Sequence, residues 1–175
     1  KLHSEPDVQS IVKTAIVDKM AAQYYRRGKL PESGSLYQLD VHIYKDTVRL
    51  SLDTTGESLF KRGYRIEHGG APLKENFAAS LIKLTPYDGT HPFIDPMCGS
   101  GTLPIEAALI ARNIAPGTWR KFAFDDFDWF DPSLHEELLE EAKSQVKPAE
   151  APIWASDIDQ SILEVAKLNA HNAGV

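Results

Sequence analysis

The spacing of apolar residues divides the chain into a short N-terminal part and a longer C-terminal part. Over residues 4–27, apolar side chains recur three and four positions apart, which predicts an amphipathic helix with Ser4 as its N-cap. Residues 37–44 and 48–53 alternate apolar and polar side chains, which predicts two half-buried strands with a turn at Lys45 and Asp46. A helix followed by a hairpin predicts a small α+β unit.

From residue 72 onward, short strands and helices alternate. In order along the chain, the expected elements are a helix over 72–84, a strand at 93–94, a helix over 103–114, a helix opened by the capping box 133–136, a strand over 153–155, and a helix with Asp159 as its N-cap. This order predicts an α/β fold with a parallel sheet. The acidic and aromatic segment 122–152 is expected to be a packed insertion.

A glycine-rich turn follows the strand at residues 93–94. Asp95 ends the strand, and Gly99 and Gly101 allow the backbone to pass close to a ligand at the start of a helix. A dinucleotide fingerprint requires a third glycine where Pro104 stands, and a P-loop requires a lysine before Thr102. A carboxylate at this turn disfavours a pyrophosphate and suits a cationic, hydroxyl-bearing ligand such as S-adenosylmethionine.

A second acidic residue is expected at the same edge of the sheet. Asp157 follows the strand over 153–155, where a carboxylate can accept hydrogen bonds from both ribose hydroxyls. It lies 56 residues after Gly101, whereas a simple unit places this acid about 20 residues on. The insertion over 122–152 accounts for the difference.

The residues from Asp95 to Thr102 resemble motif I of the class I methyltransferases, in the form found in THUMP-containing RNA methyltransferases. The segment 53–65 is similar to the linker of the bacterial 23S ribosomal RNA guanine-N2 methyltransferases, whose Gram-positive relatives were often labelled adenine-specific DNA methylases. The resemblance covers nearly the whole chain. It implies the C-terminal part of a THUMP RNA-binding domain at residues 1–55, a linker at 56–70, and the N-terminal half of a Rossmann-like methyltransferase domain at 71–175.

The resemblance also implies which residues contact S-adenosylmethionine. Glu75 falls in the helix before the first strand, near the methionine end of the cofactor; the alternative is an exposed first-turn glutamate favoured by the helix dipole. The full set of implied cofactor residues is Glu75, Asp95, Pro96, Cys98, Gly99, Ser100, Gly101, Asp157 and Ile158.

The linker carries a cluster of cations around one aromatic residue. Lys61, Arg62 and Arg65 flank Tyr64, a combination that suits RNA phosphates and base stacking. The alternative is a rigid linker whose arginines pair with nearby acids such as Asp53 or Glu57. The sequence does not decide between these two interpretations.

No catalytic residue is expected in this chain. The resembled family holds the target amino group with an Asn/Asp-Pro-Pro-Tyr/Phe loop after the fourth strand, and no Pro-Pro pair occurs here. The chain looks like an internal fragment that is inactive alone.

The activity expected of the parent is methylation of guanine N2 in 23S rRNA. The alternatives are an adenine-N6 methylase and a cofactor-free RNA-binding or assembly module, and a nicotinamide enzyme is disfavoured.

Composition limits the remaining choices. The net charge of −6 indicates that any RNA contact comes from a local basic patch. The single cysteine excludes an internal disulfide framework and fits a reducing cytoplasm. No apolar run approaches the roughly 18 residues of a membrane span, and the histidines lack metal-ligand spacing. An exposed sheet edge predicts self-association.

Overall fold

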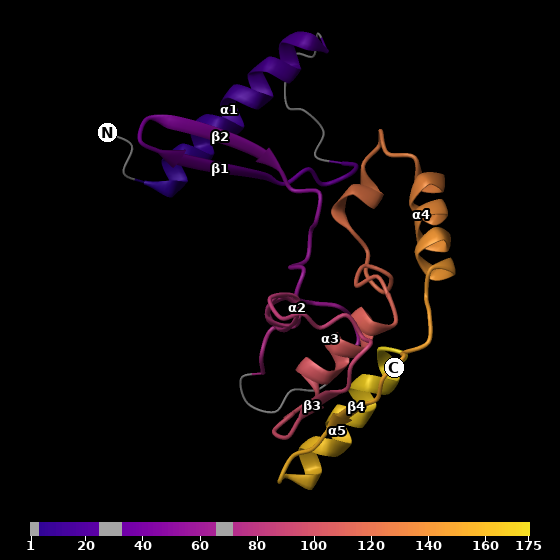
Figure 1. Ribbon diagram of the computed structural model, residues 1–175. Coiled ribbons are helices and arrows are strands. Elements are labelled where there is room, and N and C mark those ends of the chain that lie inside the picture. The colour runs from indigo at the N-terminus through magenta and orange to yellow at the C-terminus, as the bar shows by residue number, and fades with distance from the viewer. Residues whose placement is uncertain (1–3, 25–32, 66–71) are drawn as a thin grey trace. The chain divides into compact units, whose positions relative to one another are not determined.

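The computed structural model describes residues 4–24, 33–65 and 72–175. The contacts within the chain divide it into two compact units, Lys1–Asp53 and Thr54–Val175 (Figure 1). Residues 54–65, expected to belong largely to a linker, are part of the second unit. The rest of the expected linker lies outside the described residues.

The first unit contains one helix and one hairpin. Helix α1 spans Glu5–Gln23, strand β1 spans Leu39–Tyr44 and strand β2 spans Thr47–Leu52. The two strands pair antiparallel, and Lys45 and Asp46 connect them with φ angles of 45° and 60°. These angles belong to the left-handed region that two-residue hairpin turns use. The predicted hairpin is therefore confirmed.

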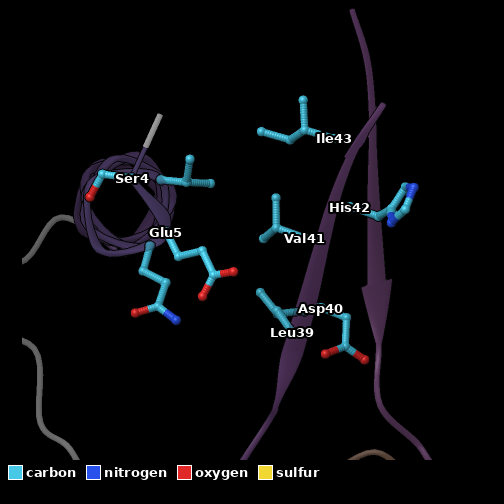
Figure 2. Close-up of a pocket in the computed structure, with 9 residues that line it drawn as sticks. Ser4, Glu5, Leu39, Asp40, Val41, His42 and Ile43 are labelled. Atoms are coloured by element: carbon cyan, nitrogen blue, oxygen red, sulfur yellow. The ribbon is translucent and has the colours of Figure 1, made fainter. Parts of the chain in front are cut away.

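Apolar and polar side chains of β1 point to opposite sides. Leu39, Val41 and Ile43 point toward α1, whereas Asp40 and His42 point away (Figure 2). A cavity of about 760 Å³ lies between the start of α1 and this strand. Within the described part of the chain α1 buries none of its residues, and Ser4 precedes it without a side-chain capping bond.

The second unit contains five helices and a two-stranded sheet in its described residues. Its elements are α2 (Glu75–Lys83), β3 (Phe93–Asp95), α3 (Thr102–Ala111), the 3₁₀ helix η1 (Ala123–Asp126), α4 (Pro132–Ser144), β4 (Ile153–Ala155) and α5 (Gln160–Asn172). Strands β3 and β4 pair in parallel, with Phe93 opposite Ile153 and Asp95 opposite Ala155. The predicted mixed α/β fold with a parallel βαβ unit is confirmed.

Helix α3 is the centre of the core because seven of its ten residues are buried. Ile105 and Leu109 are almost fully buried, together with Ala173 after α5. Tyr64, from the segment before α2, joins the same cluster at 1% exposure. The linker therefore supplies part of the core that holds α3 in place.

The segment between α3 and β4 packs around an aromatic cluster. The rings of Phe122 and Phe124 stack with their centroids 5.1 Å apart, and His135 of α4 lies edge-on to both. His135 Nδ1 lies 2.5 Å from a carboxylate oxygen of Asp125. Backbone hydrogen bonds tie η1 to the linker, including one of 3.2 Å from Phe124 N to Thr54 O. This geometry agrees with a packed insertion.

The predicted capping box of α4 is wrong in detail. The N-cap is Asp131, whose carboxylate accepts a 3.0 Å hydrogen bond from Ser133 N. Pro132 can occupy the first helical position because it has no N–H to satisfy there. The helix therefore begins before the serine that was expected to cap it.

None of the helices in the described ranges is long and apolar enough to cross a membrane.

Candidate functional site

The turn between β3 and α3 depends on two glycines in the left-handed region. Gly99 has a φ of 53° and Gly101 has a φ of 86°, which glycine adopts without steric cost. A Cβ atom on Gly101 would lie 3.1 Å from the Cβ of Ala166, whereas a Cβ on Gly99 would meet nothing within 4 Å. Gly101 is thus required by packing as well as by φ, and Gly99 leaves open space beside the turn.

Asp157 lies against this turn, as the sequence predicts. Its Oδ2 accepts a 2.9 Å hydrogen bond from Gly99 N, and its Oδ1 accepts one of 3.1 Å from Asp159 N. The backbone N–H groups of Asp159 and then Gly99 lower the pKa of Asp157 below its ordinary value, because they stabilise the carboxylate. Asp159 itself caps α5 through Ser161 N at 2.8 Å, which confirms its predicted role.

A cavity of about 360 Å³ opens between this turn and the residues that precede α2. Its lining consists of Pro72, Leu73, Asp95, Met97, Cys98, Gly99, Ser100, Thr102, Leu103 and Ile162. This size falls at the lower end of small-molecule pockets. Among the described residues of the lining Asp95 is the one that is charged, so they offer a carboxylate and backbone atoms to a ligand.

The structure brings together four of the nine predicted cofactor residues in the cavity wall: Asp95, Cys98, Gly99 and Ser100. Asp157 reaches the wall through Gly99. Gly101 turns toward α5, and Ile158 is fully exposed. Pro96, Gly101, Asp157, Ile158 and Glu75 are outside the lining.

The thiol of Cys98 is a small neutral group beside the cavity. Burial, followed by the negative charges of Asp95 and Asp157, raises its pKa above the ordinary value. The thiol is therefore held protonated, which disfavours a nucleophilic role. In the described residues no three His, Cys, Asp or Glu side chains gather where they could hold a metal ion.

Asn169 of α5 supports the turn through a hydrogen bond, and it was not identified as a site residue from the sequence. Its Nδ2 donates a 3.0 Å hydrogen bond to Ser100 O, and the residue is 1% exposed. The available signal was an amide on the otherwise apolar face of α5 that Ile162, Val165 and Ala166 define. A buried amide needs a hydrogen-bond partner, and here the partner is the backbone of the turn.

Glu75 is buried rather than exposed, so the simple dipole interpretation of this residue is wrong. Arg65 Nε donates to Glu75 Oε1 at 2.8 Å, and its Nη2 donates to Thr102 Oγ1 at 2.6 Å and to Leu73 O at 3.1 Å. The Glu75 side chain is 6% exposed. Glu75 and Arg65 therefore tie the linker and α2 to the start of α3.

A second buried network joins the linker to the middle of α3. Arg62 Nη2 lies 3.3 Å from Glu106 Oε2, and the Tyr64 hydroxyl donates to Glu106 Oε1 at 3.1 Å. Burial raises the pKa of Glu106 above its ordinary value, and the nearby Arg62 guanidinium opposes that shift. Burial, and then the charge of Glu106, also raises the pKa of Tyr64.

These contacts bear on the two interpretations of the linker. Arg62, Tyr64 and Arg65 are buried and engaged with acids, so in this conformation they offer no surface to RNA. The structure favours the rigid-linker alternative, although the partners are Glu106 and Glu75 rather than Asp53 or Glu57. Lys61 is half-exposed and pairs with Glu57 at 2.5 Å.

Sequence comparison finds related bacterial proteins. The "Putative RNA methyltransferase YpsC" of Bacillus subtilis (strain 168) is 44% identical over 99% of this chain and 46% of its own length. The ribosomal RNA large subunit methyltransferase K/L of Vibrio campbellii is 41% identical over 94% of this chain and 24% of its own length. The chain therefore spans less than half the length of these relatives.

Solved structures share the fold closely. The crystal structure of "SMU.472, a putative methyltransferase complexed with SAH" has a TM-score of 0.93 and 45% identity, covering 99% of this chain and 46% of that one. A predicted N6-adenine-specific DNA methylase from Listeria monocytogenes has a TM-score of 0.92 and 47% identity, with the same coverage.

The match to a family profile includes the turn, the cavity and both buried networks. Residues 62–175 match the family described as "RMKL-like, methyltransferase domain". This range is more than half of the chain, and it contains β3, β4 and the Gly99–Asp157 contact between them. The chain belongs to the RMKL-like methyltransferase-domain family.

Proposed function

We propose that the cavity beside Gly99 binds S-adenosylmethionine and that the chain is the cofactor-binding part of an RNA methyltransferase. The observation that carries this proposal is the 2.9 Å contact between Gly99 N and Asp157 Oδ2. It places a carboxylate from the end of β4 against an open glycine turn at the end of β3. SMU.472, which shares this fold, is complexed with SAH.

The charge of the cavity suits this cofactor better than a dinucleotide. Asp95 lines the cavity, Asp157 lies at the turn, and the described part of the lining contains no lysine or arginine. A pyrophosphate would meet negative charge there, whereas an amino group and a sulfonium would be attracted. Asp157 would accept the ribose hydroxyls, and the bare backbone at Gly99 would allow close approach. Bound S-adenosylmethionine supplies an electrophilic methyl group.

The proposed substrate is an exocyclic base amino group in RNA, with guanine N2 of 23S rRNA as the first candidate. The names of YpsC and of the Vibrio protein support an RNA substrate. The name of the Listeria structure favours adenine N6 as the second candidate. Residues 1–55 are proposed to be the C-terminal part of a THUMP domain. Since no Pro-Pro loop occurs in the sequence, the target base would be held by residues outside this chain.

Calorimetry with S-adenosylmethionine, SAH and NAD tests the cofactor proposal. The first two ligands are expected to bind and NAD is not. Asp157→Ala should weaken SAH binding by about tenfold or more, because hydrogen bonds to charged groups contribute about 1.5–3 kcal/mol. Asp131→Ala, which removes a helix cap outside the cavity, should leave SAH binding unchanged. Binding of NAD without SAH would contradict the proposal.

Transfer of a labelled methyl group identifies the base that is methylated. A chain extended to the length of its relatives, incubated with methyl-labelled cofactor and ribosomal RNA, should yield labelled N2-methylguanine after digestion. Labelled N6-methyladenine would replace the first candidate with the second. Absence of any labelled nucleoside in RNA would contradict the proposed substrate class.

A further inference from the structure

A second cleft in the Thr54–Val175 unit lies between the linker, the start of α2 and the segment after α3. We call it the linker cleft, and its volume is about 900 Å³. Its lining includes Phe60, Lys61, Lys74, Trp119, Arg120 and Lys121. Six of its lining residues are lysine or arginine and two are glutamate, although the whole chain carries a net charge of −6. Arg62 and Arg65 are buried and paired with Glu106 and Glu75. The positive charge that the cleft offers therefore comes from its other four cations, Lys61, Lys74, Arg120 and Lys121.

Two of these cations, Arg120 and Lys74, form no ion pair within the described residues. Arg120 donates to the backbone carbonyls of Ser58, Thr55 and Glu57, so its guanidinium is held in place while its charge is not neutralised by an ion pair. Lys74 forms no ion pair with the described residues, and its Nζ lies over the Phe60 ring. A polyanion entering the cleft would therefore meet positive charge that is already positioned.

Two further lysines form ion pairs that a phosphate can replace. Lys61 pairs with Glu57, and Lys121 pairs with Asp126, each at 2.5 Å. All four side chains are more than half exposed. Exposed pairs of this kind contribute about 0–1 kcal/mol, so exchanging the carboxylate for a phosphate costs little.

Two of the cations lie over aromatic rings of the cleft. Lys74 Nζ lies 4.9 Å from the centroid of the Phe60 ring, and Arg120 Cζ lies 4.9 Å from that of Phe122. Trp119 is 38% exposed beside Arg120. A basic groove with accessible aromatic faces is the usual arrangement for single-stranded nucleic acid, since every base can stack and every linkage carries a charge.

The cleft also adjoins the proposed cofactor cavity. Pro72 and Leu73 line both. A strand held in the cleft would therefore pass close to the site where the methyl donor is proposed to bind. An acidic peptide would use the cations, but unlike a nucleic acid it does not carry a planar base at every residue to stack on the indole.

We propose that the linker cleft binds a single-stranded segment of the RNA substrate. Trp119 stacks on a base, and Lys74 and Arg120 contact the phosphates on either side. The inference rests on the proposed function, because it assigns the substrate strand to a surface next to the cofactor cavity. The RNA contacts are thereby assigned to residues of the cleft, and no longer to the buried residues Arg62, Tyr64 and Arg65.

Fluorescence anisotropy with a labelled, unstructured RNA of about 12 nucleotides tests this inference, a length within the range that such grooves occupy. Trp119→Ala should weaken binding by about tenfold, and Trp119→Phe should restore most of it, because a phenyl ring still stacks. Trp129→Ala is the matched control, since Trp129 is 66% exposed and is not in the cleft lining. Equal affinity of Trp119→Ala and wild-type chain would overturn the proposal.

Salt dependence tests the phosphate contacts separately. Lys74→Ala should reduce the slope of log Kd against log salt by about 0.7, the value for one phosphate contact on a single strand. Lys143→Ala is the control, because Lys143 pairs with Glu140 on α4 away from the cleft lining. Displacement of the RNA by heparin of equal charge at equal concentration, or an unchanged slope in Lys74→Ala, would reduce the cleft to a general polyanion surface and overturn the proposal.

The same samples separate failure of this inference from failure of the proposed function. Trp119→Ala should bind SAH as the wild-type chain does, because Trp119 does not line the cofactor cavity. A wild-type chain that binds SAH but not RNA contradicts the linker cleft alone. A wild-type chain that binds neither SAH nor S-adenosylmethionine contradicts the proposed function, whatever its affinity for RNA.

Discussion

Glu106 shows at the level of a single residue why the linker is structural. It is an acid in the middle of the apolar helix α3 and is 2% exposed. Arg62 and Tyr64 are its partners, and they come from more than 40 positions earlier in the chain. A buried carboxylate requires such partners, so two residues that suit RNA by their type are used to satisfy it.

Glu106→Gln should change how stability depends on pH. Burial raises the folded-state pKa above 4.5, the ordinary value. The wild-type carboxyl therefore contributes stability that is fully present below pH 4.5 and is lost as the pH rises through the folded-state pKa. Urea unfolding at a series of pH values should show this loss in the wild-type chain relative to Glu106→Gln, which does not titrate.

The exposed Glu140→Gln is the control for the pH series, because the Glu140 side chain is 74% exposed. A constant difference between the wild-type chain and Glu106→Gln across the acid range would contradict the raised pKa.

Substitution by alanine should have different effects at the two glycines of the turn. Both have positive φ, which costs an L-residue about 1–2 kcal/mol, but only at Gly101 would the new Cβ press against Ala166 and Ile105. Gly101→Ala should therefore reduce the free energy of unfolding more than Gly99→Ala does. Gly99→Ala should instead weaken SAH binding. Chemical denaturation and calorimetry measure the two effects, and equal destabilisation would contradict the assigned packing role of Gly101.

At the level of elements, α5 fixes the position of the turn through a side chain. Asn169 reaches Ser100 O from α5, and Asn172 reaches Tyr64 O at 3.2 Å from the same helix. One contact supports the cofactor turn and the other supports the linker. The helix therefore connects the two, although it does not itself supply Asp157.

Asn169→Ala should weaken SAH binding without removing any residue from the cavity lining. Loss of a hydrogen bond to a buried carbonyl costs about 1–3 kcal/mol, and here the carbonyl belongs to the turn. Asn172→Ala removes a similar bond to the linker and should lower the free energy of unfolding while leaving SAH affinity unchanged. Equal SAH affinities in the two variants would contradict a positioning role for Asn169.

The sequence predicts the local elements well because their signals are local. The hairpin, the glycine turn and the cap at Asp159 are each determined by a few adjacent residues. Contacts between Arg65 and Glu75, or between Arg62 and Glu106, join different elements. Residue type alone could not distinguish an arginine that binds phosphate from one that binds a buried acid.

At the scale of the whole molecule, the described site belongs to one unit. The cofactor cavity, the linker cleft and both buried networks all lie in Thr54–Val175. Most of this unit matches the methyltransferase-domain family. The cavity and the cleft share Pro72 and Leu73, so a methyl donor and a nucleic-acid strand would occupy adjacent parts of the same unit.

A crystal structure of the chain grown with SAH tests the central claim most directly. We expect SAH in the cavity beside Gly99, with its ribose hydroxyls hydrogen-bonded to the carboxylate of Asp157. Crystals grown without SAH and soaked in NAD should show an empty cavity. NAD bound beside Gly99, with SAH absent under matched conditions, would contradict the account.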